Sequence, residues 1–130
     1  MERSIGGGEL KAETVAAHKG GMWAWLFQRI TAILLIVCLA IHLTFTHLLN
    51  IGDLGYDNVA DRLAHGGLTA VDIILLAAGI YHALNGLRMV LMDYWLTSRS
   101  RALAVTIVLW VVGIAFLVYG IWGLWPWIGY

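Results

Sequence analysis

Three long runs of apolar residues dominate the chain, and most of the charged residues lie outside them. The runs are continuous and do not alternate between polar and apolar positions, so they predict helices and not the strands of a barrel. Each run reaches the length of about 20 residues that a helix needs to cross a bilayer. The sequence therefore predicts three membrane-spanning helices, at residues 27–49, 68–93 and 102–124.

The composition agrees with this prediction, because 61% of the 130 residues are hydrophobic and only 12% are charged. A water-soluble domain is about half apolar at most, so the excess must face something other than water. The net charge is zero, which gives no reason to expect a nucleic-acid partner. We expect an all-α membrane protein in which residues 22–130 form a three-helix anchor and residues 1–21 form an N-terminal arm.

Basic residues gather on one side of the predicted helices. That side carries six of them, namely Arg3, Lys11, Lys19, Arg29, Arg99 and Arg101. The connection at residues 50–67 carries three aspartates and only one arginine, Arg62. Because cytoplasmic segments are enriched in Lys and Arg, we expect the N-terminus and the connection at residues 95–101 to be cytoplasmic.

The third predicted helix has no ionisable residue in its core. Its glycines, Gly113, Gly120 and Gly123, are of the kind that lets membrane helices approach closely. We therefore expect the third helix to serve packing and lipid contact, and the functional residues to lie on the first two helices.

The second predicted helix carries polar residues that are costly in lipid and so indicate a functional site. At 100° per residue, His82, Gly86, Met89 and Asp93 share one face. Imidazole is a common axial ligand of haem iron, and the glycine one turn away would leave room for a large flat ligand. Asp93 and Tyr94 reach the predicted cytoplasmic interface. A carboxylate beside a phenol could there transfer protons to or from a lipid-soluble redox substrate.

Each of these residues also has a simpler interpretation. A histidine in a membrane helix is commonly an interhelical hydrogen-bonding residue, and Asp and Tyr at a helix end are commonly interfacial anchors. We expect Arg29 to lie level with Asp93. An arginine at that depth commonly extends its side chain to the lipid headgroups. The sharper hypothesis makes Arg29 the partner of an anionic group such as a haem propionate. Spacing alone leaves both interpretations open.

The first predicted helix holds a second deep histidine, His42, which lies 13 residues after Arg29. With Arg29 level with Asp93, His42 and His82 would differ in depth by only about 4 Å. His42 is deep enough to need a polar partner. The small difference in depth argues against two cofactors stacked one above the other.

Two motifs carry a resemblance to a known family. The first helix begins R-x-T-A-I-L at Arg29, and the second carries His-x3-Gly-x6-Asp-Tyr from His82 to Tyr94. With three spans and 130 residues, the chain resembles the smaller cytochrome b-type membrane anchor of succinate dehydrogenase, respiratory complex II. The resemblance covers nearly the whole chain after residue 20.

The resemblance implies a subunit that helps to bind haem b and quinone and passes electrons from an iron–sulfur subunit to the quinone. It implies that His82 is an axial ligand of the haem iron and that Arg29 contacts a propionate. Tyr94 would hydrogen-bond the quinone carbonyl, and Asp93 would support its protonation. Some anchors of this family bind two haems, and His42 would be the ligand of a second haem.

The implied partners are a second membrane anchor subunit that supplies the other haem ligand, an iron–sulfur subunit, a flavoprotein subunit that oxidises succinate, and the lipid bilayer. A trimer of such heterotetramers is one arrangement that the resemblance allows. The implied location is the inner membrane of a bacterium or an archaeon.

Three alternatives differ from this function. An anchor of a quinol:fumarate reductase would use the same groups, because the direction of electron flow depends on the quinone and the soluble subunits. In a non-redox structural subunit, His82 and Asp93 would only hydrogen-bond to neighbouring helices. A small proton-coupled transporter is disfavoured, since three helices with one polar stripe leave little room for a pathway.

Overall fold

The computed structural model describes residues 21–49, 55–95 and 98–127, which fold into helices joined by short connections. Three of these helices are long and apolar enough to cross a membrane. The prediction of an all-α membrane protein with three spans is confirmed.

The first span is longer than the apolar run suggested. Helix α2 (Gly21–Leu43) begins six residues before the expected residue 27 and continues through a π-helical turn at Thr44–Leu48. Helix α4 (Gly66–Tyr94) is the second span, and helix α5 (Arg99–Leu124) is the third. The predicted N-terminal arm lies outside the described residues except for Gly21.

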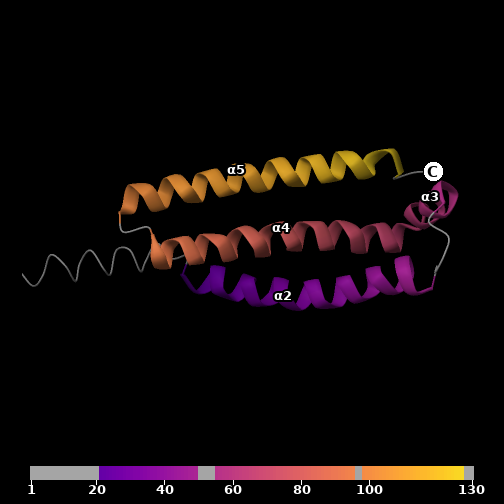
Figure 1. The fold of residues 1–130 in the computed structure, drawn as a ribbon, viewed down its shortest axis with the longest axis horizontal. Helices are drawn as coiled ribbons and strands as arrows, with labels where there is room; N and C mark the ends of the chain where they lie inside the picture. The colour runs from indigo at the N-terminus through magenta and orange to yellow at the C-terminus, as the bar shows by residue number, and fades with distance from the viewer. Residues whose placement is uncertain (1–20, 50–54, 96–97, 128–130) are drawn as a thin grey trace, which may run out of the picture.

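The three long helices form a single layer with α4 in the middle (Figure 1). Helix α2 packs on one side of α4 and helix α5 packs on the other. Helices α2 and α5 begin at the end of the layer at which α4 finishes, and Arg99 and Arg101 lie at this end, which we call the basic end. The opposite end carries the short helix α3 (Tyr56–Ala64).

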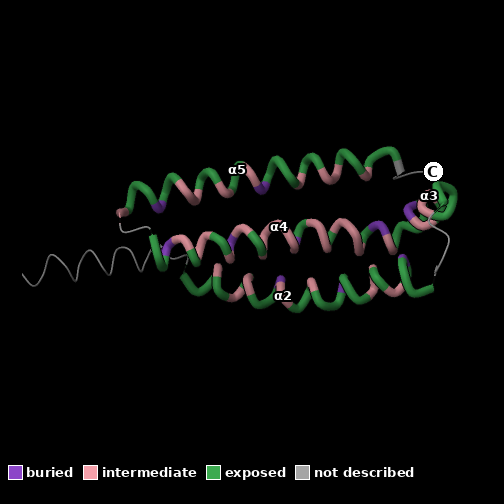
Figure 2. Tube along the Cα trace, viewed as in Figure 1, coloured by how far each residue is buried: buried purple, intermediate pink, exposed green. Residues whose placement is uncertain are grey.

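A layer one helix thick buries few side chains (Figure 2). Among the described residues, the buried apolar side chains are Cys38, Leu63, Ala78, Met92 and Ala102. Large apolar side chains are exposed along all three long helices. Such surfaces are compatible with lipid or with neighbouring subunits, and not with water.

Two glycines of α5 bring it close to α4, as the sequence predicted. A methyl group on Gly113 would lie 2.8 Å from the Leu84 side chain, and one on Gly120 would lie 2.6 Å from the Leu76 side chain. For Gly123, no described residue of this chain lies within 4 Å of that position, so it does not bring α5 close to α4.

Helix α3 was not foreseen within the connection at residues 50–67. It is short and amphipathic, with Asp57 in its first turn and Arg62 in its last turn. At these ends both charges interact favourably with the helix dipole. Leu63 is buried, and its carbonyl accepts a hydrogen bond from the Thr69 hydroxyl of α4. These contacts place α3 against the start of α4.

Candidate functional site

The contact between α2 and α4 sets two histidines opposite polar side chains. Near the middle of the contact, Thr31 of α2 faces His82 of α4. Toward the α3 end, His42 of α2 faces Asp72 of α4. Each histidine therefore has a partner on the neighbouring helix.

The His82 ring is held by the Thr31 hydroxyl, whose oxygen lies 3.1 Å from Nδ1. The same hydroxyl donates to the carbonyl oxygen of Phe27, 2.7 Å away, one turn earlier on α2. A hydroxyl has one proton, so when it donates to the carbonyl it must accept from the imidazole. The proton of a neutral His82 ring then lies on Nδ1, and Nε2 keeps its lone pair.

The His82 backbone is held as well. The Gln28 amide nitrogen donates to the His82 carbonyl at 3.1 Å, and the Gln28 amide oxygen accepts from Asn85 at 2.8 Å. Asn85 also donates to the carbonyl of Ala24 at 3.2 Å. Four side chains, those of Gln28, Thr31, His82 and Asn85, thus form one polar cluster in the seam between the helices, which we call the His82 cluster.

Gly86 accommodates a side chain of α2. A methyl group at this position would lie 3.2 Å from the Gln28 amide nitrogen, which is a tight contact. The glycine therefore lets Gln28 reach the His82 carbonyl. The space that the sequence suggested for a flat ligand next to Gly86 is taken, on the α2 side, by this amide.

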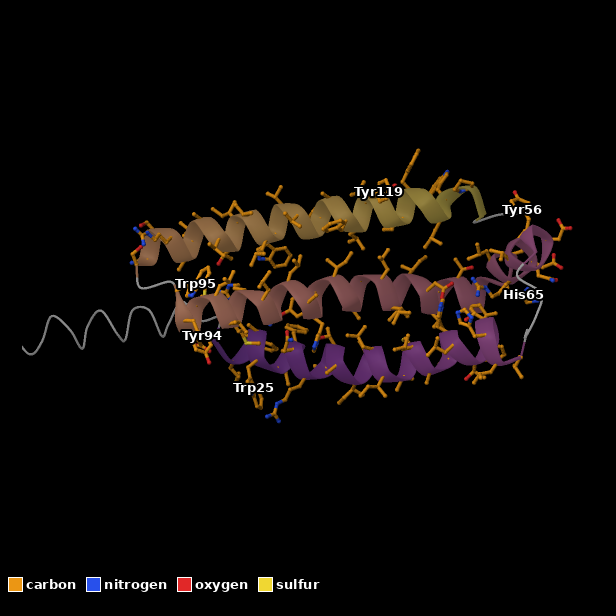
Figure 3. All side chains as sticks on the ribbon, viewed as in Figure 1. Trp25, Tyr56, His65, Tyr94, Trp95 and Tyr119 are labelled. Carbon is orange, nitrogen blue, oxygen red and sulfur yellow. The ribbon has the colours of Figure 1, made fainter. Side chains whose placement is uncertain are left out.

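The register of α2 against α4 corrects the predicted position of Arg29. Because Thr31 faces His82 and Gln28 contacts Asn85, Arg29 lies near the level of those residues and not level with Asp93. Its guanidinium lies 4.0 Å from the centre of the Trp25 ring on the exposed side of α2. Trp25 points away from α4 in Figure 3. The structure does not bring Arg29 to His82.

His42 has the polar partner that its depth required. Its Nδ1 lies 2.7 Å from an Asp72 carboxylate oxygen, and both side chains are mostly buried. The His47 ring lies edge-on at 6.4 Å. Because Thr31 marks the level of His82, His42 lies 11 residues, or about 16 Å, further along the layer. The predicted depth difference of about 4 Å is wrong, and so is the argument against two stacked cofactors that rested on it.

The predicted quinone residues lie at the basic end. Tyr94 is the last residue of α4 and is 80% exposed, and Asp93 beside it is also exposed. Tyr94 and Trp95 lie together at this end of the layer in Figure 3. The helical spacing puts Asp93 about 16 Å along the axis from His82.

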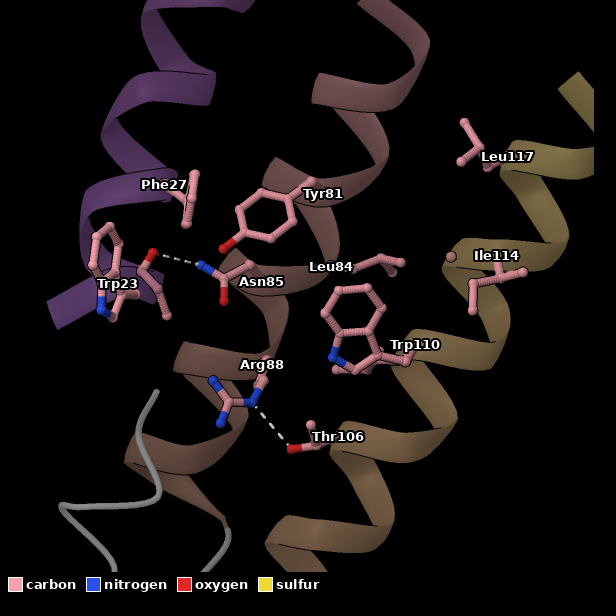
Figure 4. A pocket seen from close by; sticks show the side chains of 13 residues that line it. Trp23, Phe27, Tyr81, Leu84, Asn85, Arg88, Thr106, Trp110, Ile114 and Leu117 are labelled. Atoms are coloured by element: carbon pink, nitrogen blue, oxygen red, sulfur yellow. Dashed lines mark hydrogen bonds between the residues drawn. The ribbon is translucent and has the colours of Figure 1, made fainter. Parts of the chain in front are cut away.

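Arg88, to which the sequence gave no role, lies in a groove between the helices. Its Nε donates to the Thr106 hydroxyl of α5 at 3.0 Å, and that hydroxyl donates to the carbonyl of Ala102 at 2.8 Å. The groove encloses about 440 Å³ and is lined by residues of all three long helices (Figure 4).

The sequence did not predict the contacts that Gln28, Thr31 and Asp72 make between α2 and α4. Gln28 and Thr31 are polar residues one turn apart at the start of an apolar run, which was a usable signal. Asp72 was visible as a carboxylate inside the second apolar run. Their partners depend on the register of two helices, which a single sequence pattern does not supply.

Comparison with known proteins gives a consistent result. Residues 10–124 match the family described as succinate dehydrogenase/fumarate reductase transmembrane subunit. The succinate dehydrogenase 2 membrane subunit SdhC of Mycobacterium tuberculosis is 26% identical over 114 residues, which cover 88% of this chain and 82% of that protein.

Two further relatives are succinate dehydrogenase hydrophobic membrane anchor subunits. The protein from Rickettsia felis is 31% identical over 100 residues, which cover 77% of this chain and 82% of the relative. The protein from Archaeoglobus fulgidus is 40% identical over 70 residues, which cover 54% of this chain and 60% of the relative. No solved structure matches the chain significantly.

Proposed function

This chain belongs to the succinate dehydrogenase/fumarate reductase transmembrane subunit family, and we propose that it anchors a succinate:quinone oxidoreductase, helps to bind haem b and quinone, and passes electrons from the iron–sulfur subunit to the quinone. Its named relatives are membrane subunits of succinate dehydrogenase. An anchor of a quinol:fumarate reductase is the alternative within the same family.

The observation that carries the haem proposal is the contact between Thr31 and His82. An imidazole that ligates iron through Nε2 needs its proton on Nδ1 and a partner that fixes the ring there. The Thr31 hydroxyl, already donating to the Phe27 carbonyl, fits that role. Within the described part of the chain, Nε2 of His82 has no hydrogen-bond partner.

When bound, haem would supply one-electron chemistry at a potential set by its axial ligands and surroundings. The chain's own residues position the ligand. Thr31 holds the His82 ring, and Gln28 holds the same residue at its carbonyl, so a rotation of either helix would disturb both contacts. Asn85 holds Gln28 in turn.

A second haem at His42 is the second candidate, and the structure favours it with one observation. The Asp72 carboxylate at His42 Nδ1 orients the ring and leaves the other ring nitrogen as the potential ligand. The axial separation of about 16 Å from the level of His82 leaves space between two sites.

The proposed quinone site lies at the basic end, with Tyr94 and Asp93 as this chain's contribution. There the Tyr94 hydroxyl would donate to a quinone carbonyl, and Asp93 would support the uptake of protons. Full reduction of a quinone takes two electrons and two protons. The exposure of both residues supports a site that neighbouring subunits complete.

The proposed assembly contains a second anchor subunit that supplies the other haem ligand, an iron–sulfur subunit at the basic end and a flavoprotein subunit. Such heterotetramers would associate as trimers in the inner membrane of a bacterium or archaeon. The positive-inside rule puts the basic end on the cytoplasmic side. A propionate contact for Arg29 stays a prediction, since its guanidinium lies on Trp25.

An optical spectrum of the purified complex tests the haem proposal. The dithionite-reduced minus oxidised spectrum should show the bands of a b-type haem. A complex that contains all four subunits, oxidises succinate and shows no haem bands would contradict the proposal. It would favour the non-redox structural role for this chain.

The quinone site is tested by Tyr94→Phe, which removes one hydroxyl from an exposed residue. Quinone reductase activity should fall by about tenfold or more, because a hydrogen bond made to the developing charge is lost. Succinate oxidation with an artificial dye acceptor should not change. An equal loss of both activities would indicate an assembly defect and would count against the proposed contact.

A further inference from the structure

A second cavity lies at the α3 end of the layer, which is opposite the basic end (Figure 1). It encloses about 380 Å³. Phe45 and Leu49, at the end of the first span, and Leu68, in the first turn of α4, line it with apolar side chains. The rest of the lining is polar and comes from α3 and the residue that follows it. The cavity therefore has an apolar wall and a polar wall.

The polar wall is built on one side of α3. Asn58 and Arg62 lie one helical turn apart, and His65 follows the end of the helix. The His65 Nδ1 donates to the Asp61 carbonyl at 2.7 Å, which fixes the ring against the last turn of α3. Figure 3 shows His65 at this end of the layer.

Arg62 is the residue of this wall that lacks a partner. Its Nε is covered by the rest of the chain and has no hydrogen-bond acceptor. None of the described carboxylates forms an ion pair with its guanidinium. Asp61 also lines the cavity, but its side chain is exposed, so water can solvate its charge. A covered cation without a partner is strongly destabilising, so Arg62 requires an acceptor that the described part of the chain does not supply.

The chemistry of the wall selects a carboxylate. The planar guanidinium presents a fork of N–H groups that matches the two oxygens of a carboxylate, and the Asn58 amide beside it adds a further donor. The neighbouring apolar side chains are open as well, since Phe45 is 43% exposed and Leu49 is 65% exposed. A helix that packs on these two residues would bring its own end to Arg62.

We propose that this cavity receives a carboxylate side chain of the second membrane anchor subunit and that Arg62 binds it as a buried ion pair. This inference rests on the proposed assembly, in which the iron–sulfur subunit occupies the basic end, so an acceptor at the opposite end comes from another membrane subunit. The apolar wall supplies the packing surface for the partner helix. The ion pair fixes the depth at which that helix lies against this chain.

A zero-length cross-link in the purified complex tests the contact directly. Arg62→Lys keeps the charge and places an amine in the cavity, where a water-soluble carbodiimide joins it to a carboxylate in contact with it. We expect an amide bond to an aspartate or glutamate of the second anchor subunit, identified by mass spectrometry of the joined peptides. Ala64→Lys, at an exposed position of α3 outside the cavity lining, is the matched control and should give no such product.

The sign of a second substitution provides an independent test. Arg62→Met replaces the cation by an apolar side chain. If Arg62 is paired in the complex, this change leaves the partner's carboxylate buried alone, and the second anchor should dissociate in detergent about tenfold faster or more. If the guanidinium is unpaired in the complex, the same change removes an uncompensated charge, and dissociation would be slower or unchanged. A slower or unchanged rate would contradict the ion pair.

Three cross-linking results would overturn the proposal. The same product from Arg62→Lys and Ala64→Lys would show that the contact does not involve the cavity, and the lack of any product would show that no carboxylate touches Arg62. A product in which the amine is joined to a haem propionate would make the cavity part of a haem site instead. Both readouts are independent of haem content and quinone reduction, so their failure is distinguished from failure of the proposed haem and quinone sites. A purified complex without a second anchor subunit would contradict the proposed assembly itself.

Discussion

His82 and His42 both present Nδ1 to a side chain of the neighbouring helix, but the partner is a hydroxyl at His82 and a carboxylate at His42. The hydroxyl adds no net charge to the middle of the layer, and it fixes the ring because it is itself bound to the Phe27 carbonyl. The carboxylate brings a charge that must be stabilised by the imidazole.

The difference suggests what each contact contributes. In a low-dielectric setting a charged group is costly unless it is paired, so the His42–Asp72 contact is expected to hold the two helices together. The Thr31–His82 contact costs little and leaves the ring available. We therefore expect substitutions at His82 to affect cofactor binding and substitutions at His42 or Asp72 to affect stability.

The sharpest test of this comparison is the haem content of two alanine variants. His82→Ala should abolish the b-haem bands, because an axial ligand is lost, whereas His42→Ala should leave the haem content of the complex unchanged. The pyridine haemochrome assay, set against protein concentration, measures both. If His42→Ala halves the haem of a complex that contains two, the second haem is real and the two histidines have the same function.

A smaller effect is expected when the hydroxyl at His82 is removed. Thr31→Val keeps the shape of the side chain and should weaken haem binding by about 10–100-fold, as found for residues that orient metal ligands. Thr31→Ser keeps the hydroxyl and is the matched control. The rate of haem transfer to apomyoglobin and the midpoint potential of the haem report the change. Valine and serine variants with identical values would exclude a role for this contact in ligation.

The smallest effect should come from Asp72. Asp72→Ala removes the acceptor of a partly buried histidine and should lower the free energy of unfolding by about 1–3 kcal/mol. A double-mutant cycle with His42→Ala, followed by unfolding in SDS, gives the coupling between the two side chains. Asp61→Ala on the exposed side of α3 serves as the control. Additive effects of Asp72→Ala and His42→Ala would mean that the pair does not stabilise the fold.

The sequence was sufficient for the three spans, because long continuous apolar runs have one structural solution in lipid. It also singled out His82 and His42 as polar groups that need partners. It did not predict the register. Helix α2 begins at Gly21, earlier than the apolar run indicated, and Thr31 faces His82. Arg29 is therefore not level with Asp93 as expected.

Helix α3 and the groove depend on contacts that no periodic pattern records. The amphipathic helix α3 at Tyr56–Ala64 is too short for its sequence pattern to be distinguished from that of a polar connection. The position of Arg88 became interpretable only when Thr106 of α5 was found beside it, 18 residues away along the chain. Both contacts are set by how the helices pack.

The thickness of the layer determines how much of this subunit contacts its surroundings. In a layer of three helices joined by two narrow seams, most side chains that would form the core of a larger bundle lie on the surface. Most apolar side chains of the chain therefore form an interface and not a core, and that interface is completed by whatever covers the two broad faces of the layer.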